Sequence, residues 1–206
     1  MMQLLVGTTN RGKFAEFEAY LKQFPLEIRS LQSLLDYPAV VEDGATFEEN
    51  ALKKARALAE ASGLLTLADD SGLEVDALGG APGVYSARYC GEEGNDAKNN
   101  EKLLEALRDV PEPERTARFV CVLALCDPRS RELKTWTVQA SCAGCIALRP
   151  TGLNGFGYDP LFFYPPFGKT FGEIDRATKA SVSHRGTALK KFVELLPAVV
   201  DLGRKP

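Results

Sequence analysis

The stretch from residue 67 to residue 89 constrains the fold more than any other part of the chain. An apolar run over residues 64–68 ends in two adjacent carboxylates, Asp69 and Asp70, and an alternating apolar run over residues 73–77 follows. This pattern predicts a strand, an acidic turn and a second strand. Adjacent carboxylates repel each other unless a cation lies beside them, and their hard oxygens suit Mg²⁺. Taken alone, the motif fits a solvated hairpin with ordinary turn residues at least as well.

A glycine- and proline-rich segment, residues 79–83, comes directly after this stretch. Its composition is incompatible with regular structure. The segment leads to Arg88, a permanently charged side chain suited to phosphate.

Composition indicates an ordinary globular protein. The chain has 206 residues, 45% of them hydrophobic and 26% charged, which predicts one domain over residues 1–206. A formal charge of −3 argues against a nucleic-acid polymer as partner but is compatible with small phosphorylated ligands. The N-terminus does not resemble a signal peptide, and no apolar run reaches transmembrane length. We therefore expect a cytoplasmic protein with no membrane partner.

The five cysteines do not predict a disulfide framework, because their number is odd and an export signal is lacking. Cys142 and Cys145 have the spacing of a redox or zinc motif. They lie in a strand-like run, however, whereas a low thiol pKa is expected at the start of a helix. We expect structural cysteines.

A strand over residues 4–7 runs into the polar segment 8–13 and then into a helix. A helix N-terminus offers backbone N–H groups to an anion, and Arg11 and Lys13 add full charges. The spacing is not that of a Walker motif. A capped helix start with solvated cations remains an equal alternative.

A second helix is predicted after Glu42 and Asp43, with Thr46 and Glu49 forming a capping box and Gly63 ending the helix. Glu49 is therefore expected to be structural. Glu42 and Asp43 lie outside the helix and are available as metal ligands.

Further elements are predicted by apolar periodicity along the rest of the chain. They comprise a strand over residues 27–31, a helix over 95–107 and an antiparallel pair of strands over 119–125 and 136–142.

Two later segments carry candidate binding residues. Phe156 lies between Gly155 and Gly157, an arrangement that exposes a ring on which a nucleobase could stack, although a core Phe in a tight turn is nearly as good a reading. Asp159 could accept hydrogen bonds there. Residues 179–186 gather the donors Lys179, His184 and Arg185 before another helix, and the lone His is as compatible with a structural role as with ligand binding.

Read together, six segments resemble the inosine/xanthosine triphosphate pyrophosphatases, which hydrolyse non-standard purine nucleoside triphosphates to monophosphate and pyrophosphate. Each segment is weak evidence alone, but six in register are specific, and they cover nearly the whole chain. The segments are Thr8–Lys13, Thr46–Ala51, Asp69–Leu73, Gly80–Tyr89, Gly155–Pro160 and Ser183–Gly186.

The resemblance implies an α/β fold, elongated and two-lobed, around a long mixed β-sheet with flanking helices and a central cleft. It also implies a homodimer that depends on Mg²⁺. Asp70 would be the catalytic base and a metal ligand, with Glu42 as the second metal ligand; Asp43 is the alternative, because the spacing there varies among members. The implied substrate-binding residues are Thr8, Thr9, Asn10, Arg11, Gly12, Lys13, Ser71, Phe156, Gly157, Tyr158, Asp159, Lys179, His184 and Arg185.

Two other functions compete with this interpretation. A nucleotide sensor without hydrolysis would have no use for the adjacent carboxylates, which hinder binding of a polyanion. The second alternative is a pyrophosphatase that acts on other nucleotides, such as modified pyrimidine nucleotides. A panel of substrates would distinguish it from the purine-specific enzyme. A scaffold role is the least favoured.

Overall fold

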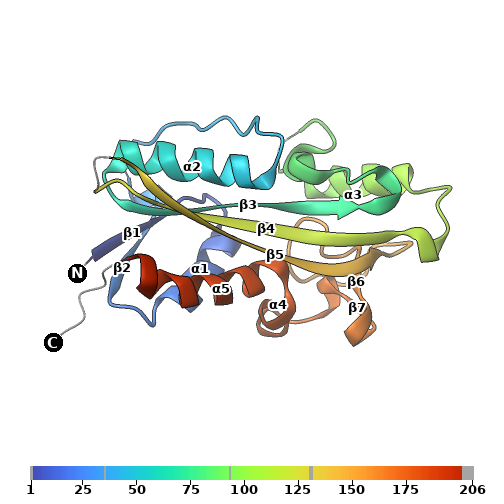
Figure 1. The fold of residues 1–206 in the computed structure, drawn as a ribbon. Coiled ribbons are helices and arrows are strands. Elements are labelled where there is room, and N and C mark those ends of the chain that lie inside the picture. The colour runs from blue at the N-terminus through green and yellow to red at the C-terminus, as the bar shows by residue number, and fades with distance from the viewer. Residues whose placement is uncertain (1, 35, 93, 130–131, 201–206) are drawn as a thin grey trace. The chain divides into compact units, whose positions relative to one another are not determined.

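The computed structural model describes residues 2–34, 36–92, 94–129 and 132–200. Its strands form one seven-stranded sheet in the order β2-β1-β3-β4-β5-β6-β7, and helices flank the strands (Figure 1). The strands are β1 (Met2–Val6), β2 (Leu26–Ser30), β3 (Leu65–Val75), β4 (Thr116–Asp127), β5 (Lys134–Ile146), β6 (Phe162–Tyr164) and β7 (Lys169–Thr170). The helices are α1 (Arg11–Leu21), α2 (Phe47–Ser62), α3 (Asp96–Ala106), α4 (Arg176–Val182) and α5 (His184–Val199).

The sheet is mixed. β1 pairs in parallel with β2 and with β3, whereas β6 pairs antiparallel with β5 and with β7. The predicted α/β class, with a long mixed sheet and flanking helices, is therefore confirmed. No helix in the described ranges is both long enough and apolar enough to span a membrane.

The chain divides into two compact units. The first comprises the described residues of Met1–Asp70, Val122–Gln139 and Thr187–Pro206, and the second comprises those of Ser71–Cys121 and Ala140–Gly186. Three strands, β3, β4 and β5, contribute residues to both units. On β3 the division falls between Asp70 and Ser71.

In the first unit, helices cover both faces of the strands. Figure 1 shows α2 on one face and α5 on the other. Three buried leucines, Leu5, Leu31 and Leu58, join β1, the turn after β2 and α2 in one apolar cluster. The register between β1 and β3 pairs Leu4 with Leu65 and Val6 with Leu67. This pairing brings the end of β1 and the polar segment after it alongside β3.

The predicted acidic turn is wrong. β3 runs without a break from Leu65 to Val75, and Asp69 and Asp70 lie inside it. The strand lies between β1 and β4 and is buried along almost its whole length. Because a central strand has ladder partners on both sides, the hydrogen bonds that it makes outweigh the preference of Asp, Ser and Gly for turns.

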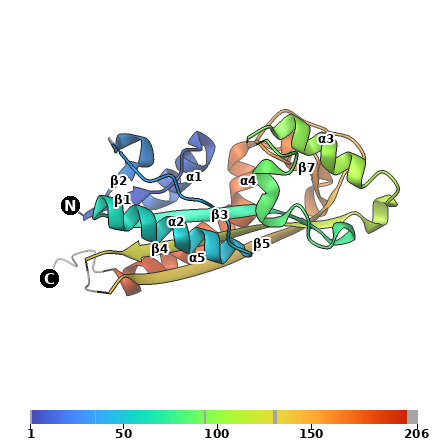
Figure 2. The same ribbon diagram turned by 90° about the horizontal axis from the view of Figure 1, so that it is seen from above.

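In the second unit, an apolar core joins β3, α3, β4 and the chain around β6. Its aromatic members pack closely, with ring centroids of Phe119 and Phe162 4.5 Å apart and those of Phe162 and Phe171 4.9 Å apart. Leu73, Leu103 and other buried apolar residues complete the core. Figure 1 shows α3 on one side of these strands and β7 on the other, so the two overlap when the strands are seen from above (Figure 2).

The other predicted helices and strands are present with shifted ends. Thr46 caps α2 as predicted, because its Oγ1 accepts a hydrogen bond from the backbone N–H of Glu49 at 3.1 Å. The Glu49 carboxylate accepts from the N–H of Ala45 at 2.7 Å, one residue before the cap. Gly63 ends the helix with a φ of 67°. The predicted helix over 95–107 corresponds to α3, and the predicted pair of strands corresponds to the neighbours β4 and β5.

Candidate active site

The segment between β1 and α1 has the geometry of a capped helix start. The Asn10 side chain accepts a hydrogen bond from the backbone N–H of Lys13 at 3.0 Å, and Thr8 Oγ1 accepts from the N–H of Asn10 at 3.2 Å. The first turn of α1 contains no acidic residue, whereas Arg11 and Lys13 both lie in it. Thr8 to Lys13 therefore lie together, and the positive end of the helix is reinforced by two cations.

Asp69 pairs with a cation from α1. The Lys13 ammonium lies 2.8 Å from the carboxylate of Asp69, which is almost completely buried. This ion pair explains how one of the two adjacent carboxylates is accommodated inside β3, because a buried charge needs a partner.

Asp70 lies in a different electrostatic environment. The pKa of its carboxyl group is raised to about 6, because burial and the charge of Glu42 together outweigh the opposing effect of Lys54. Lys54 pairs with Glu42 at 3.0 Å. Glu42, Asp70 and Lys54 therefore form one cluster, which we call the acidic cluster.

The neighbouring carboxylate, Asp43, has a different partner. Its side chain is mostly exposed and pairs with Lys53, which lowers the pKa of Asp43. Of the two candidate metal ligands, Glu42 is the one that interacts with Asp70.

The donor set of the acidic cluster fits Mg²⁺. Among the described residues, no group of three or more His, Cys, Asp or Glu side chains could hold a metal ion. Mg²⁺ characteristically needs fewer, because it binds through one or two carboxylates together with waters and substrate phosphates. Glu42 and Asp70 supply such hard oxygen ligands, and a cation would relieve their mutual repulsion, which contributes to the raised pKa of Asp70.

Two residues that act on Asp70 were not predicted from the sequence. Lys54 was not singled out, and neither was Asn50, which is fully buried, accepts a hydrogen bond from the N–H of Gly44 at 2.8 Å and lowers the pKa of Asp70. The available signal was their spacing: Asn50 and Lys54 are four residues apart and lie on one side of a helix.

A second group of predicted residues lies in the second unit, around the loop from Gly155 to Asp159. Gly155 and Gly157 both have positive φ, 79° and 61°. Asp159 is buried, and its carboxylate accepts hydrogen bonds from the backbone N–H of Phe156 at 2.9 Å and from Lys179. A Cβ on residue 155 would lie 1.9 Å from this carboxylate. The loop is therefore folded around the Asp159 side chain.

Phe156 lies over two cations. Its ring centroid is 4.7 Å from the Lys179 ammonium and 5.6 Å from the Arg185 guanidinium, both within cation–π range. The ring is half-buried, as a stacking platform requires, and it is absent from the apolar core. Burial raises the pKa of Asp159, and the adjacent Lys179 opposes this shift.

The three donors before the last helix lie in two helices. Lys179 lies in α4, which Asp175 caps by accepting from the N–H of Thr178 at 2.9 Å, and His184 and Arg185 begin α5. Arg185 donates to Ser71 Oγ at 2.9 Å. The His184 ring stacks on Phe119 at 4.7 Å, so the structure assigns His184 a packing contact in the core.

Most of the predicted site residues are thus brought together in two groups, each within its own unit. The residues Thr8 to Lys13, Glu42 and Asp70 belong to the first unit. Ser71, Phe156 to Asp159, Lys179, His184 and Arg185 belong to the second. Arg88 also lies in the second unit, where its guanidinium is 5.3 Å from the ring centroid of Tyr85.

Comparison with known proteins shows the family. A sequence model of the Ham1 family matches residues 4–195. The chain belongs to the Ham1 family. The family resemblance inferred from the six segments is therefore confirmed.

The Ham1 relatives match over most of their length. A protein of Syntrophobacter fumaroxidans named dITP/XTP pyrophosphatase is 57% identical over 186 residues, which are 90% of this chain and 78% of the relative. A Geobacter sulfurreducens protein of the same name is 52% identical over 92% of this chain and 94% of its own. The solved structure of a HAM1 protein from Coxiella burnetii has a TM-score of 0.88 at 38% identity, covering 97% of this chain and all (100%) of that one.

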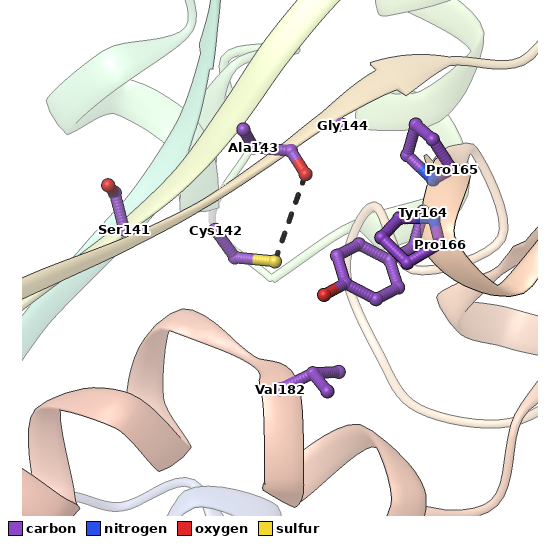
Figure 3. Close-up of a pocket in the computed structure, with 8 residues that line it drawn as sticks. All are labelled: Ser141, Cys142, Ala143, Gly144, Tyr164, Pro165, Pro166 and Val182. Carbon is purple, nitrogen blue, oxygen red and sulfur yellow. Dashed lines mark hydrogen bonds between the residues drawn. The ribbon is translucent and has the colours of Figure 1, made fainter.

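One pocket of this Ham1 member is lined by none of the predicted site residues. It has a volume of about 510 Å³, and residues 141–144 of β5 face Tyr164, Pro165 and Pro166 across it (Figure 3). Its lining includes Cys142, whose thiol pKa is raised to about 11 by burial. The pKa of Cys145 is raised as well. Thiols with raised pKa are poor nucleophiles and poor metal ligands, which agrees with the predicted structural role of the cysteines.

Proposed function

We propose that the chain is a Mg²⁺-dependent pyrophosphatase that hydrolyses the non-standard purine nucleoside triphosphates ITP, dITP and XTP to monophosphate and pyrophosphate, clearing them from the nucleotide pool. The observation that carries this proposal is the acidic cluster, in which Glu42 and Asp70 lie with Lys54. The names of the Ham1 relatives quoted above support the same activity.

The chemistry requires water to attack the α-phosphorus in line while pyrophosphate leaves. Phosphoryl transfer depends mostly on positioning and on charge neutralisation. When bound, Mg²⁺ would neutralise phosphate charge and activate water. Asp70 is suited to take the proton of that water, because a general base works best when its pKa lies near the operating pH. The segment from Thr8 to Lys13 would hold the triphosphate, and Lys13 would offset charge on the departing pyrophosphate.

The group around Phe156 would bind the nucleoside. A base stacked on an aromatic side chain gains about 1–3 kcal/mol irrespective of its identity. Selectivity would come from Lys179 and Arg185, which are donors and cannot accept hydrogen bonds. They match the 6-oxo group of hypoxanthine and xanthine and oppose the 6-amino group of adenine, and such a mismatch can discriminate strongly.

The proposal also covers the setting of the reaction. Residues of both units would act on one substrate, so residues 1–206 would form one catalytic domain with two lobes and a central cleft. The enzyme would work as a cytoplasmic homodimer with no nucleic-acid or membrane partner.

A turnover panel tests the activity. Purified protein with Mg²⁺ should release pyrophosphate, and not phosphate, from ITP, dITP and XTP far faster than from ATP or from modified pyrimidine triphosphates. EDTA should abolish turnover, and Asp70→Asn should lower kcat at least a hundredfold. The matched control is Asp43→Asn. Asp43 is the neighbour of Glu42 in the chain, and its exposed carboxylate pairs with Lys53. Tight binding of ITP without turnover would instead identify a sensor.

The selectivity hypothesis has its own test. In Lys179→Ala and Arg185→Ala the ratio of kcat/KM for ITP to that for ATP should fall at least tenfold. Unchanged ratios in both variants would refute the role of these donors while leaving the pyrophosphatase proposal intact.

A further inference from the structure

The loop that carries Phe156 is held by a helix outside all six recognised segments. Asp96 in the first turn of α3 accepts a hydrogen bond from the backbone N–H of Gly157 at 2.7 Å. One turn later, Asn100 Nδ2 donates to the backbone carbonyl of Gly157 at 2.9 Å. The two side chains are four residues apart and share one face of the helix. We call this pair of contacts the Gly157 clasp.

The clasp acts on the peptide groups next to Phe156. The N–H that Asp96 binds belongs to the peptide bond between Phe156 and Gly157, and the carbonyl that Asn100 binds belongs to the following peptide bond. With both groups fixed, the backbone dihedrals of Gly157, whose φ is 61°, are fixed as well. The direction in which the Phe156 side chain leaves the backbone then depends on α3.

The neighbouring contacts hold residues on either side of Gly157, and among the described residues only the clasp binds both the N–H and the carbonyl of this glycine. On one side of Gly157, the Asp159 carboxylate accepts from the backbone N–H of Phe156 and the N–H of Asp159 donates to the carbonyl of Phe156 at 3.2 Å; on the other side, the Tyr158 hydroxyl donates to the carbonyl of Ser86 at 2.8 Å. Between those anchors lies a glycine, the residue with the greatest backbone freedom. A Cβ at position 157 would meet nothing within 4 Å, so packing does not restrict this residue.

We propose that Asp96 and Asn100 are positioning residues that hold Phe156 in the orientation in which a purine stacks on it. The inference rests on the proposed function, because it assigns the clasp to the nucleoside end of that substrate site. Ordering the loop before the substrate arrives removes an entropic cost from binding. The clasp therefore acts on substrate affinity and leaves the hydrolytic step, which involves the acidic cluster, unaffected.

Substitutions at the clasp separate this role from a purely structural one. Asp96→Ala should raise KM for dITP about tenfold, as expected for loss of a hydrogen bond to a charged group, with kcat changed less than twofold. Asp96→Asn keeps an acceptor oxygen and should restore KM to within about threefold of the wild type. Asn100→Asp is isosteric but places an oxygen against the Gly157 carbonyl, so it should raise KM more than Asn100→Ala does. The control is Glu101→Ala, an exposed residue of the same helix, which should leave both constants unchanged.

A double-mutant cycle identifies Phe156 as the residue through which the clasp acts. In a Phe156→Ala background, Asp96→Ala should raise KM less than twofold further, because the ring it positions is gone. A full tenfold rise in that background, or a fall in kcat with KM unchanged, would overturn the proposal. If the wild type does not turn over dITP, or Phe156→Ala leaves KM unchanged, the proposed function or its nucleoside site fails instead. These outcomes are read from the wild type and the single Phe156 variant, before the clasp is tested.

Discussion

At the scale of single residues, Asp70, the proposed general base, also affects how the stability of the protein depends on pH. Its pKa is raised to about 6, chiefly by burial, from an ordinary value of 3.8. Between these two values the folded protein holds a proton that the unfolded chain has lost. Stability contributed by this group is therefore present at low pH and is lost as the pH rises through about 6.

We predict that Asp70→Asn removes this pH dependence from the metal-free protein. One pKa unit corresponds to about 1.4 kcal/mol, so the variant should gain about 2–3 kcal/mol over the wild type between pH 4 and pH 7. Urea denaturation in EDTA at several pH values measures the difference. A difference between the two proteins that is the same at all pH values would contradict the assigned pKa.

Gly155 allows a second prediction at this scale. Its φ of 79° is unfavourable for any side chain, and a Cβ would lie 1.9 Å from the Asp159 carboxylate. Gly168 has a φ of 60° with nothing within 4 Å of its Cβ position. Gly168→Ala should therefore cost only the conformational strain, about 1–2 kcal/mol, whereas Gly155→Ala should cost more and also weaken dITP binding. Urea denaturation measures the loss of stability in each variant. Equal losses would show that the clash of the added Cβ with the Asp159 carboxylate does not destabilise the protein.

At the scale of elements, α2 connects helix capping to the acidic cluster. The helix begins at the Thr46 cap, and it carries Asn50 and Lys54 at positions that reach Asp70 and Glu42. Neither side chain can reach these partners unless the first turns of α2 are formed.

We predict that Thr46→Ala lowers the free energy of unfolding by about 1 kcal/mol, the usual loss for a side-chain N-cap. Thr46→Ser keeps the hydroxyl acceptor and should lose only a fraction of this. Because the first turn positions Asn50, the Ala variant should also lower kcat more than the Ser variant. A stability loss shared equally by both variants would assign the effect to the methyl group and not to the cap.

The elements also show which sequence signals were decisive. Capping residues, the terminal glycine and the apolar periodicity of α2 are local, and they placed the helix correctly. β3 was interpreted as two strands because Asp69, Asp70, Ser71 and Gly72 are typical turn residues. Ladder hydrogen bonds from two neighbouring strands and the ion pair with Lys13 are non-local, and they keep this segment extended.

At the scale of the whole molecule, the accessibility of the cysteines tests whether they are free thiols with a structural role. All five are free thiols; Cys121, Cys126 and Cys142 are buried, and Cys90 and Cys145 are partly exposed.

We predict that a thiol reagent labels two cysteines in the native protein and all five in denaturant. Cys90 should react before Cys145, because burial and the charge of Glu112 raise the pKa of Cys145. Mass spectrometry of the labelled protein identifies the sites. Fewer than five labelled thiols in denaturant without reductant would reveal a disulfide.

By itself, the sequence determined the helices, most of the strands and the family, because apolar periodicity, capping and the six short segments each depend on residues close together in the chain. Most of the residues proposed for the site were implied by that family resemblance. The tertiary structure alone decided how those residues are partnered. Lys13 with Asp69 and Asp96 with the peptide of Gly157 are contacts between residues 56 and 61 positions apart in the chain, and Lys54 with Glu42 joins α2 to the segment before it. Such contacts depend on strand register and on how helices pack against strands, and a shift of one residue in either would break them. No local pattern records that geometry, which is why the position of Lys54 beside Glu42 and Asp70, and the Gly157 clasp, emerged only from the folded chain.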